Sequence, residues 1–410
     1  MTCQTTASIE TETLDGAVIQ YRTELERSGY SQGTINEHVR SLQRLRRLLD
    51  EHNIPLSGLT AGIAEQFAQR ETSRPNQRSY DVFIAKRFTD HLAARGLLKP
   101  PPSPTVRELA RAALRSDYED HLRRQRGLSE RTIYHCWRFA DRFLNFRFEA
   151  ADVTLSAIVP GDVVAFLQQL TSRKAPFRDK TPPTHLRNFL KYLFRAGLTP
   201  SNLALCVPSV AQRYNANLPR HIAPDQVEAV LAAVRADELV GRRNYAMVLL
   251  LARFGLRAAE VVAMQLDDID WRASELVVRG KGKNHDRVPL PPDVGEALAA
   301  YVQQDRKSTS RALFVNSRAP HRPFKDGQVL NTILKAAFAS AGVAPPCRYV
   351  GSHVLRHSLA VNLVRQGASL AEVADMLRHR SRVSTLIYAK LDVEGLRSIA
   401  QPWPVAGGAR

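Results

Sequence analysis

The sequence predicts a mainly α-helical protein with one small antiparallel β-sheet in its C-terminal half. Helices are favoured because apolar residues recur at intervals of three and four along most of the chain, and proline-rich stretches separate these regions. The sheet is predicted by two runs rich in β-branched residues that flank a Gly-Lys-Gly-Lys-Asn turn within Glu275–Pro291. With 44% hydrophobic and 24% charged residues among 410, the composition is that of a folded chain.

Two proline-containing stretches divide the chain. Leu97–Thr105 reads LLKPPPSPT, whose consecutive prolines cannot continue a helix, and Val207–Pro224 mixes Pro, Asn and basic residues without an apolar period. Long unstructured segments are uncommon inside a compact domain, so we expect linkers, with an ordinary surface loop as the alternative. The expected regions are a first helical module, a second helical module, a C-terminal domain and a tail, at residues 15–98, 107–206, 220–400 and 401–410.

The two N-terminal regions resemble each other. The segment YRTELERSGYSQGTINEHVRSLQRLRRLL from Tyr21 aligns with YEDHLRRQRGLSERTIYHCWRFADRFLNF from Tyr118, with one inserted residue near Gly127. In both, a serine that suits a helix N-cap, Ser31 or Ser129, precedes a Thr-Ile pair. One small helical module used twice is the expectation, against two amphipathic helices that merely look alike. The apolar stripes predict core faces at Ile35, Val39, Leu42 and Leu45, and at Ile133, Trp137, Ala140 and Phe143.

The C-terminal region should place several helices around the β-hairpin. Whether that hairpin stands alone or forms the central pair of a three-stranded sheet is open. Apolar periodicity predicts helices at residues 225–252, 257–266, 293–304, 326–341, 354–366, 370–378 and 383–390.

The charge balance indicates a polyanionic partner. Lys and Arg number 58 against 40 Asp and Glu, so the formal net charge is +18. Nucleic acid is the commonest polyanion for a basic chain of this kind, and a merely solvated basic surface is the alternative.

Several classes of protein are disfavoured. No window approaches about 18 consecutive apolar residues, and the N-terminal segment MTCQTTASIETETLDG lacks the basic and apolar regions of a signal peptide. We therefore expect neither export nor a membrane partner. Cys3, Cys136, Cys206 and Cys347 lie far apart without a C-x-x-C pair, which indicates no disulfide framework and no cysteine zinc site. This usage favours a reducing, cytoplasmic location.

Short segments of the C-terminal region carry candidate functional residues, none decisive alone. Arg257 and Glu260 lie three residues apart, as in an ordinary ion pair on a helix surface. Lys281 lies in the hairpin turn, where a lysine is usually solvated. His379 and Tyr388 follow nine residues apart, and a single tyrosine near a helix end is more often a packing residue.

A further segment, SHVLRHSLAVNLV, places two histidines and an arginine within one helical turn. His353 and His357 have the spacing of a zinc-binding helix, but that motif requires Glu directly after the first histidine and the residue here is Val354. A zinc site is therefore not expected, and Arg356 lies between the two histidines.

In this order and with these local sequences, the segments resemble the catalytic domain of the tyrosine recombinases, the phage integrase family. The resemblance covers about residues 220–400 and implies a mainly helical α+β catalytic domain. It also implies that the preceding modules are SAM-like helical core-binding domains, most clearly at 107–206, with 15–98 as a second copy. It rests on GLRAAEVVAMQLDDID around Arg257, GKGKNHDRVPL around Lys281, HVLRHSLAVNLVRQGASLAEVADMLRH from His353 to His379, and Tyr388 beyond.

The resemblance implies a nucleophile and a phosphate clamp. Tyr388 matches the residue whose phenolic oxygen attacks a DNA phosphate to give a 3′-phosphotyrosyl enzyme and a free 5′-hydroxyl. Arg257 and Arg356 match the arginines that hold the non-bridging oxygens. This role suits arginine, because its guanidinium binds phosphate oxygens bidentately and keeps its charge near neutral pH.

The remaining matches concern proton transfer and support. Lys281 matches the lysine that protonates the leaving 5′-oxygen, which requires neighbouring cations to lower its pKa. His353 and His379 match positions that assist proton transfer and bind the phosphate, and Glu260 matches an acidic position that supports the first arginine. Because the covalent intermediate conserves the phosphodiester energy, no ATP, metal or other cofactor is expected. Consistently, the sequence has no P-loop and no carboxylate cluster for paired Mg²⁺ ions.

One position departs from the family pattern. The family usually has Leu-Gly-His at the second histidine, and this chain has Leu377, Arg378 and His379. The charge of Arg378 could contact a phosphate or distort the site.

The implied partner is double-stranded DNA with a specific target site. The family acts as a tetramer on paired sites, and DVEGLRSIAQPWP after Tyr388 resembles the tail that docks into a neighbouring protomer. We expect a cytoplasmic, nucleoid-associated homotetramer. Two alternatives stay open: an accessory recombinase that depends on sister recombinases, and a type IB topoisomerase-like relaxing activity. The biological role, among integration, excision, transposition and resolution, is also open.

Overall fold

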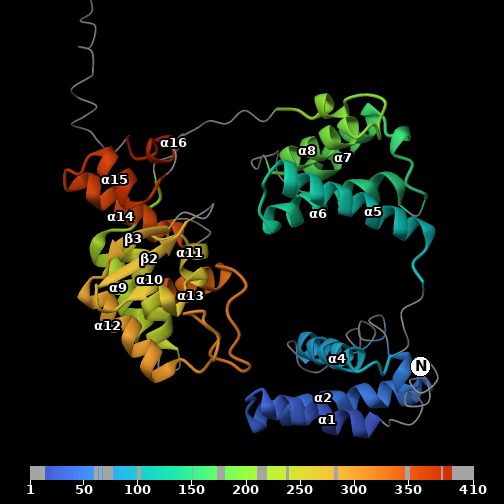
Figure 1. The fold of residues 1–410 in the computed structure, drawn as a ribbon, viewed down its shortest axis with the longest axis horizontal. Coiled ribbons are helices and arrows are strands. Elements are labelled where there is room, and N and C mark those ends of the chain that lie inside the picture. The colour runs from blue at the N-terminus through green and yellow to red at the C-terminus, as the bar shows by residue number, and fades with distance from the viewer. Residues whose placement is uncertain are drawn as a thin grey trace, which may run out of the picture. The chain divides into compact units, whose positions relative to one another are not determined.

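The structure is a computed structural model, and the predicted fold class is confirmed: the chain is mainly helical with one small antiparallel sheet (Figure 1). No helix within the described parts of the chain is long and apolar enough to cross a membrane. The residues that the structure describes are 14–59, 63, 67, 77–98, 103–149, 151–172, 181–209, 219–236, 240–280, 285–346, 351–379 and 382–389.

Within the described residues, the first helical region has three helices and a core of its own. They are α1 (Leu14–Arg27), α2 (Gln32–Glu51) and α4 (Gln77–Ala94), with a 3-10 turn at Leu56–Gly58. Each helix contacts the other two, and the buried face of α2 meets those of α1 and α4.

The second helical region lies within residues 100–214, which separate as a compact unit of the chain. A π-helical turn and two 3-10 turns connect its helices. In chain order the elements are α5 (Val106–Asp120), the π turn His121–Gln125, α6 (Glu130–Phe148), Leu155–Ala157, α7 (Pro160–Ser172), α8 (Thr181–Arg195) and Leu203–Cys206.

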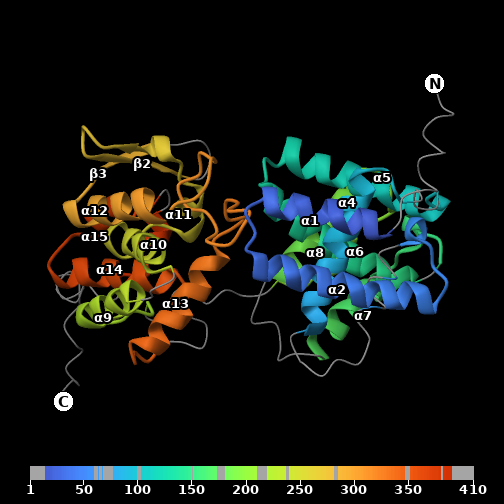
Figure 2. The same cartoon turned by 90° about the horizontal axis from the view of Figure 1, so that it is seen from below.

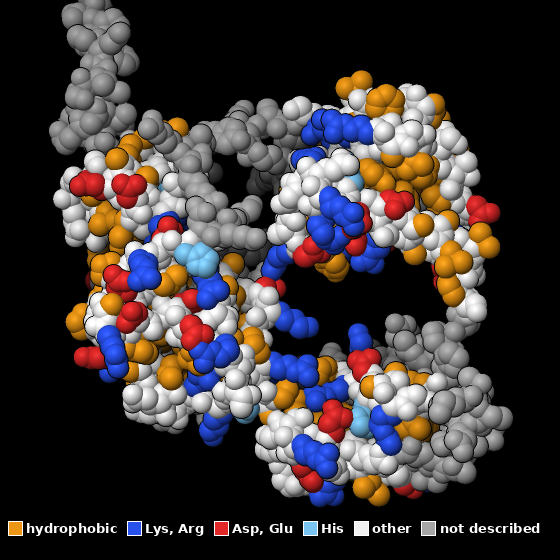
Figure 3. All heavy atoms as spheres, viewed as in Figure 1, with side chains coloured by type: hydrophobic (Ala, Val, Ile, Leu, Met, Phe, Trp, Pro, Cys, Tyr) orange, Lys and Arg blue, Asp and Glu red, His pale blue; other side chains and the backbone are white. Residues whose placement is uncertain are grey.

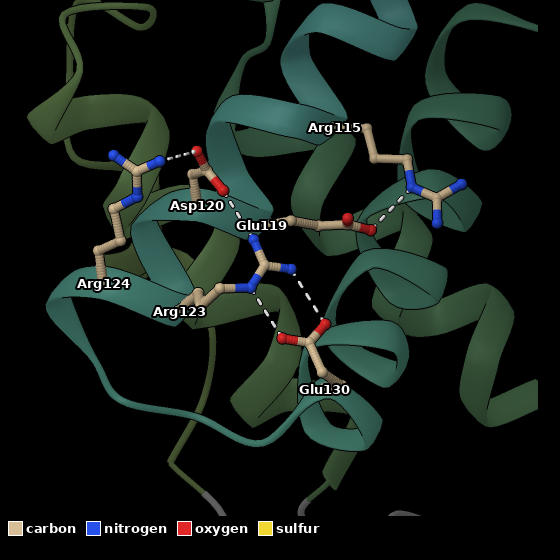
Figure 4. A network of polar contacts seen from close by, with 6 residues as sticks. All are labelled: Arg115, Glu119, Asp120, Arg123, Arg124 and Glu130. Atoms are coloured by element: carbon tan, nitrogen blue, oxygen red, sulfur yellow. Dashed lines mark hydrogen bonds and ion pairs between the residues drawn. The ribbon is translucent and has the colours of Figure 1, made fainter.

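Ion pairs hold the turn between α5 and α6 (Figure 4). Arg123 donates to both carboxylate oxygens of Glu130 at 2.7 and 3.0 Å and to Asp120 at 2.6 Å. Arg124 also approaches Asp120, at 3.2 Å. These pairs join the end of α5 to the first turn of α6, although exposed pairs of this kind each stabilise by about 1 kcal/mol or less.

The two helical regions have matching local structure. Both predicted N-caps are confirmed: the hydroxyls of Ser31 and Ser129 each accept a bond from the main-chain N–H three residues later, at 3.4 Å. Tyr21 meets Phe88 edge-on with ring centroids 5.4 Å apart, and the pair Tyr118 and Phe189 repeats this contact at 5.1 Å. These shared contacts support the interpretation of one module used twice.

The predicted core stripes are confirmed with one correction. In α6 all four predicted positions are buried, but in α2 Val39 is only half-buried and its neighbour His38 is 1% exposed instead. The reason is a tertiary contact, because Nδ1 of His38 bonds to the buried hydroxyl of Tyr21 at 3.0 Å. A polar residue thus completes the first core.

The C-terminal region surrounds one buried helix, α10 (Gly241–Phe254). Helices α9, α12, α13 and α14 all contact it, and the sheet lies on the side opposite α9 and α14 (Figure 2). Residues 246–252 of α10 are all buried. The other helices are α9 (Pro224–Arg235), α11 (Ala258–Ala263), α12 (Pro292–Ala300), α13 (Gln328–Ser340), α14 (His353–Arg365), α15 (Leu370–Met376) and α16 (Arg382–Thr385), with a π turn at Tyr301–Asp305 and a 3-10 turn at Leu266–Asp268.

The sheet has three antiparallel strands in sequence order. β1 (Ile269–Asp270) pairs with β2 (Glu275–Arg279), and β2 pairs with β3 (His285–Pro289). In the second pair Val277 lies opposite Arg287. The predicted hairpin is therefore present as the β2–β3 pair, with β2 in the centre.

The prediction of a helix over 225–252 was wrong, because the structure has two helices there. α9 ends at Arg235 and α10 begins at Gly241. A Cβ atom at Gly241 would lie 2.8 Å from the main-chain oxygen of Arg235, so the two helices approach too closely for a larger residue. The predicted helices at 257–266 and 383–390 are also shorter than expected.

The expected domain boundaries at 15–98, 107–206 and 220–400 stay a prediction. Within the described residues, each of these regions contains its own set of buried apolar side chains. Lys281, Cys3, Cys347 and the tail at 401–410 lie outside the described residues.

Candidate active site

The first part of the site lies where α10 gives way to α11. Gly255 follows α10 in the left-handed conformation (φ +58°), and Arg257 is the N-cap residue of α11. The carboxylate of Glu260 accepts the Arg257 main-chain N–H at 2.8 Å and its guanidinium Nη1 at 2.6 Å. Glu260 is buried, whereas the Arg257 side chain is 42% exposed. One carboxylate thus caps the helix and orients a guanidinium that still faces solvent.

Arg356, on α14, is the buried cation of the site, with 4% of its surface exposed. Its guanidinium donates from Nη1 to the main-chain oxygen of Gly255 and from Nη2 to that of Leu377, the latter at 2.5 Å. Burial, and then the charge of Arg257, lower its pKa to about 10, so it remains a cation at neutral pH. Arg356 therefore ties α14 to the segments that carry Arg257 and His379.

Two histidines flank Arg356 on α14. His353 is the first residue of the helix and is solvent-exposed, and His357 is half-buried one turn later. Desolvation of the ring, and then the charges of Arg356 and Arg257, lower the pKa of His353. Burial, followed by the neighbouring His353 and Arg356, lowers the pKa of His357 to about 4. Both rings are therefore neutral at physiological pH.

Tyr388 lies three residues after α16, where its main-chain N–H donates to the Thr385 oxygen at 2.9 Å. The side chain is 1% exposed, and its ring belongs to an apolar cluster formed by α14 and α15. Burial raises the pKa of Tyr388 to about 12, with Arg356 acting in the opposite direction. Its hydroxyl is hydrogen-bonded to Nδ1 of His357 at 2.6 Å.

His379 supports the segment that carries Tyr388. Its Nδ1 lies 2.8 Å from the hydroxyl of Thr385, and its ring is parallel to that of Tyr388 with centroids 6.5 Å apart. Burial, then Arg356 and Arg257, lower its pKa to about 4. Among the described residues, His379 therefore bonds to Thr385 near Tyr388, whereas the Tyr388 hydroxyl bonds to His357.

Arg378 occupies the place of the family's usual glycine in a conformation that favours glycine, with φ +53°. Its side chain turns inward and is 11% exposed. Nη2 donates to the main-chain oxygen of Phe254 at 3.3 Å and lies 3.9 Å from Glu260, while Nη1 donates to Met376 at 3.2 Å. The extra charge is thus directed toward the end of α10, beside the Arg257–Glu260 pair.

The site carries an excess of positive charge. Arg257, Arg356 and Arg378 lie around a single buried carboxylate, that of Glu260, and lower one another's pKa where a shift is resolved. Because like charges at short range are unfavourable, a bound anion would relieve their repulsion. The arrangement suits a phosphate group.

Six of the predicted site residues therefore come together in the structure, and the seventh, Lys281, lies outside the described residues. His357, which the sequence pattern suggested only as a zinc ligand, also lies in this cluster. The sequence signal that could have indicated a role in the site is its position directly after Arg356, one helical turn from His353. Within the described ranges, no group of three or more His, Cys, Asp or Glu side chains is arranged to hold a metal ion.

Comparison with known proteins identifies the family of the chain. Residues 220–394 match the phage integrase family. A putative integrase/recombinase of Sinorhizobium fredii is 42% identical over 289 residues, which cover 70% of this chain and 70% of the relative. Tyrosine recombinase XerC of Anoxybacillus flavithermus is 29% identical over 291 residues, 68% of this chain and 93% of the relative.

Two solved structures share the fold. A lambda integrase (75–356) dimer bound to a COC′ core site has a TM-score of 0.52 and 14% identity, over 72% of this chain and 99% of that one. XerH recombinase in a post-cleavage complex with palindromic difH has a TM-score of 0.52 and 19% identity, over 69% of this chain and 83% of that one.

The fold and the similarity of sequence define a DNA-recombining enzyme. The chain belongs to the phage integrase family of tyrosine recombinases, and its general activity is site-specific DNA recombination.

Proposed function

We propose that the chain exchanges DNA strands between two copies of a specific site through a covalent 3′-phosphotyrosyl intermediate on Tyr388. The observation that carries the proposal is the convergence of Tyr388 with Arg356 and Arg257, which come from separate segments of the C-terminal region. Attack on a phosphodiester requires a nucleophile, here the tyrosine, beside positively charged groups that bind the phosphate.

The proposed cleavage begins when a DNA phosphate binds between the guanidinium groups. Arg257 and Arg356 hold the non-bridging oxygens, and Glu260 keeps Arg257 in position from behind. The Tyr388 oxygen then attacks phosphorus, and the 5′-oxygen leaves with a proton that we assign to Lys281. The released 5′-hydroxyl of a partner strand attacks the phosphotyrosyl bond in the reverse direction, so no external energy source is needed.

His353 and His379 have supporting roles in this proposal. His353 is exposed at the start of α14, where its ring can donate to a bound phosphate. His379 holds Thr385 and so positions the turn that carries Tyr388.

The helical modules at 15–98 and 107–206 are proposed to hold the DNA opposite the catalytic domain. They differ in charge: the first has 12 Lys and Arg against 10 Asp and Glu, whereas the second has 17 against 10. On the faces that Figure 3 shows, positive and negative side chains lie close together. The second module is therefore the better candidate for the main backbone contacts, and binding should weaken steeply as salt rises.

We further propose a homotetramer on paired DNA sites, acting in the cytoplasm at the nucleoid. A pocket of about 480 Å³ beside His379 supports a tail-docking contact between protomers, because α15 and the turn after α16 supply an apolar wall. It is lined by Leu370, Ala371, Ala374, Asp375, His379, Thr385 and Leu386.

The test of the nucleophile uses a nicked suicide duplex that contains the target site, identified first by footprinting. The native chain should form a covalent protein–DNA band on a denaturing gel, and Tyr388→Phe should bind the duplex but form none. Tyr134→Phe is the matched control, since this exposed tyrosine lies in the second helical module. A covalent band from Tyr388→Phe would refute the assignment. Relaxation of supercoiled DNA without a specific site would favour the topoisomerase-like alternative, and activity only beside a sister recombinase would favour the accessory one.

A further inference from the structure

The inference concerns the proton that Tyr388 must lose. Among the described residues of the site, the hydrogen bond shown for the phenolic oxygen is the one to Nδ1 of His357, at 2.6 Å. The other two histidines are placed differently: Nδ1 of His379 is bonded to Thr385, and the His353 ring centroid lies 6.4 Å from that of His357. A general base must lie within hydrogen-bond distance of the proton it takes, and His357 meets this condition.

The direction of this hydrogen bond follows from the ionisation states. The phenol is protonated, because burial raises its pKa to about 12. The imidazole of His357 is neutral, because its pKa is lowered to about 4. A neutral phenol donates, so Nδ1 of His357 accepts and the ring proton lies on Nε2.

We propose that His357 is a catalytic residue that accepts the phenolic proton of Tyr388 during DNA cleavage. The inference rests on the proposed role of Tyr388 as nucleophile. As the bond from Oη to phosphorus forms, the proton of Oη passes to Nδ1 of His357. The bond from phosphorus to the 5′-oxygen breaks, and that oxygen takes a proton from a separate acid, proposed to be Lys281. In rejoining, His357 returns its proton to the departing phenolate.

The charges around His357 explain why this transfer would await DNA. The ring is faced by His353 and Arg356 on its own helix, by His221 ahead of α9, and by Tyr388 and His379 from the other side. The positive charge of Arg356 disfavours a protonated His357. A phosphodiester bound to Arg356 adds a negative charge that opposes it, so the imidazolium becomes more favourable once the substrate is in place.

The first experiment changes the leaving group, so that loss of a general base can be distinguished from loss of a general acid. Single-turnover cleavage is compared on a normal suicide duplex and on one with sulfur in place of the 5′-bridging oxygen, since a thiolate leaves without a proton. His357→Ala should cleave both about 10²–10⁴-fold more slowly than the native chain, the range typical of a lost general base. Lys281→Ala should be slow on the oxygen substrate and restored on the sulfur substrate. His52→Ala, at an exposed histidine in the first module, should match the native chain on both.

A second measurement separates proton transfer from positioning. The cleavage rate of His357→Ala should rise about tenfold per pH unit above neutrality, where the phenolate forms without help, and added imidazole should restore part of the rate. His357→Gln keeps a hydrogen-bond acceptor near Tyr388 but cannot accept the proton, so it should remain slow and unaffected by imidazole.

Three outcomes would overturn the role of His357. They are cleavage by His357→Ala at the native rate, rescue of His357→Ala by the sulfur substrate, and full activity of His357→Gln. Each leaves the proposed function intact, because that proposal fails only if Tyr388→Phe still forms the covalent complex.

Discussion

Nη2 of Arg356 donates to the main-chain oxygen of Leu377 at 2.5 Å, across 21 residues of chain. The same guanidinium also bonds to the carbonyl of Gly255. Arg356 therefore has a structural function beside its proposed contact with phosphate: it satisfies two main-chain acceptors next to Arg257 and His379. Four predictions follow from this arrangement and from the first helical module.

Replacement of Arg356 by Lys should reduce formation of the covalent complex by about 10²-fold or more. A single ammonium cannot bond to both carbonyls and a phosphate in the planar geometry of a guanidinium. The rate is measured by single-turnover cleavage of the suicide duplex. Arg253→Lys is the control, because Arg253 makes exposed ion pairs with Glu228 and Asp293 on the same chain region. Equal activity of the two variants would contradict the role of Arg356.

Replacement of Gly255 by Ala should destabilise the C-terminal region by about 2–4 kcal/mol. The residue has φ +58°, which costs about 1–2 kcal/mol for a residue with a Cβ, and that Cβ would lie 2.6 Å from the Leu377 side chain. Thermal unfolding measures the change. Gly295→Ala is the matched control: it lies in the helix α12 with an ordinary 3.6 Å contact, and should stabilise by about 0.5–1 kcal/mol. Unfolding of both variants at the same temperature would show that the Gly255 conformation is not required.

Two substitutions of Arg378 separate the cost of its backbone conformation from the effect of its charge. Arg378→Ala and Arg378→Gly both remove the guanidinium, but only glycine adopts φ +53° without strain. The Gly variant should therefore be more stable than the Ala variant by about 1 kcal/mol in denaturant unfolding. Both should keep cleavage within about tenfold of the native rate, because Arg257 and Arg356 remain. A Gly variant less stable than the Ala variant would mean that the positive φ is not retained without the arginine.

His38 should make the first helical module sensitive to acid. Burial and the charge of Arg87 lower its pKa to about 4 from an ordinary 6.5. Between these values the unfolded chain binds a proton that the folded chain does not, so stability is lost as pH falls from about 6.5 to 4. The loss is at most about 3 kcal/mol.

The variant His38→Cys tests this, because Cys136 occupies the equivalent place in the second module. It should be somewhat less stable at pH 8, through the lost bond to Tyr21, but should lose little more on acidification. Proteolysis of the full chain at pH 8 and pH 5, with fragments from residues 14–98 followed by mass spectrometry, measures the difference. His52→Gln should retain the native acid sensitivity; if His38→Cys retains it too, the sensitivity arises elsewhere.

Much of the local structure could be predicted from the sequence, because helix caps and apolar periodicity act within one or two turns. Ser31 and Ser129 are N-caps as expected, and the hairpin around the Gly-Lys-Gly-Lys-Asn turn has its predicted strands. The break between α9 and α10 was missed, although Gly241, a residue type that disfavours helix interiors, lies at the start of α10.

The sequence by itself determined the family and the fold class. Its resemblance to the family also predicted Arg257, Arg356 and Tyr388 as site residues without any coordinates. Only the tertiary structure decided that His357 contacts the Tyr388 hydroxyl and that Arg378 turns inward toward Glu260. The physical reason is distance along the chain: these contacts join residues 31 and 118 positions apart, so they depend on how α14, α15 and the end of α10 pack together.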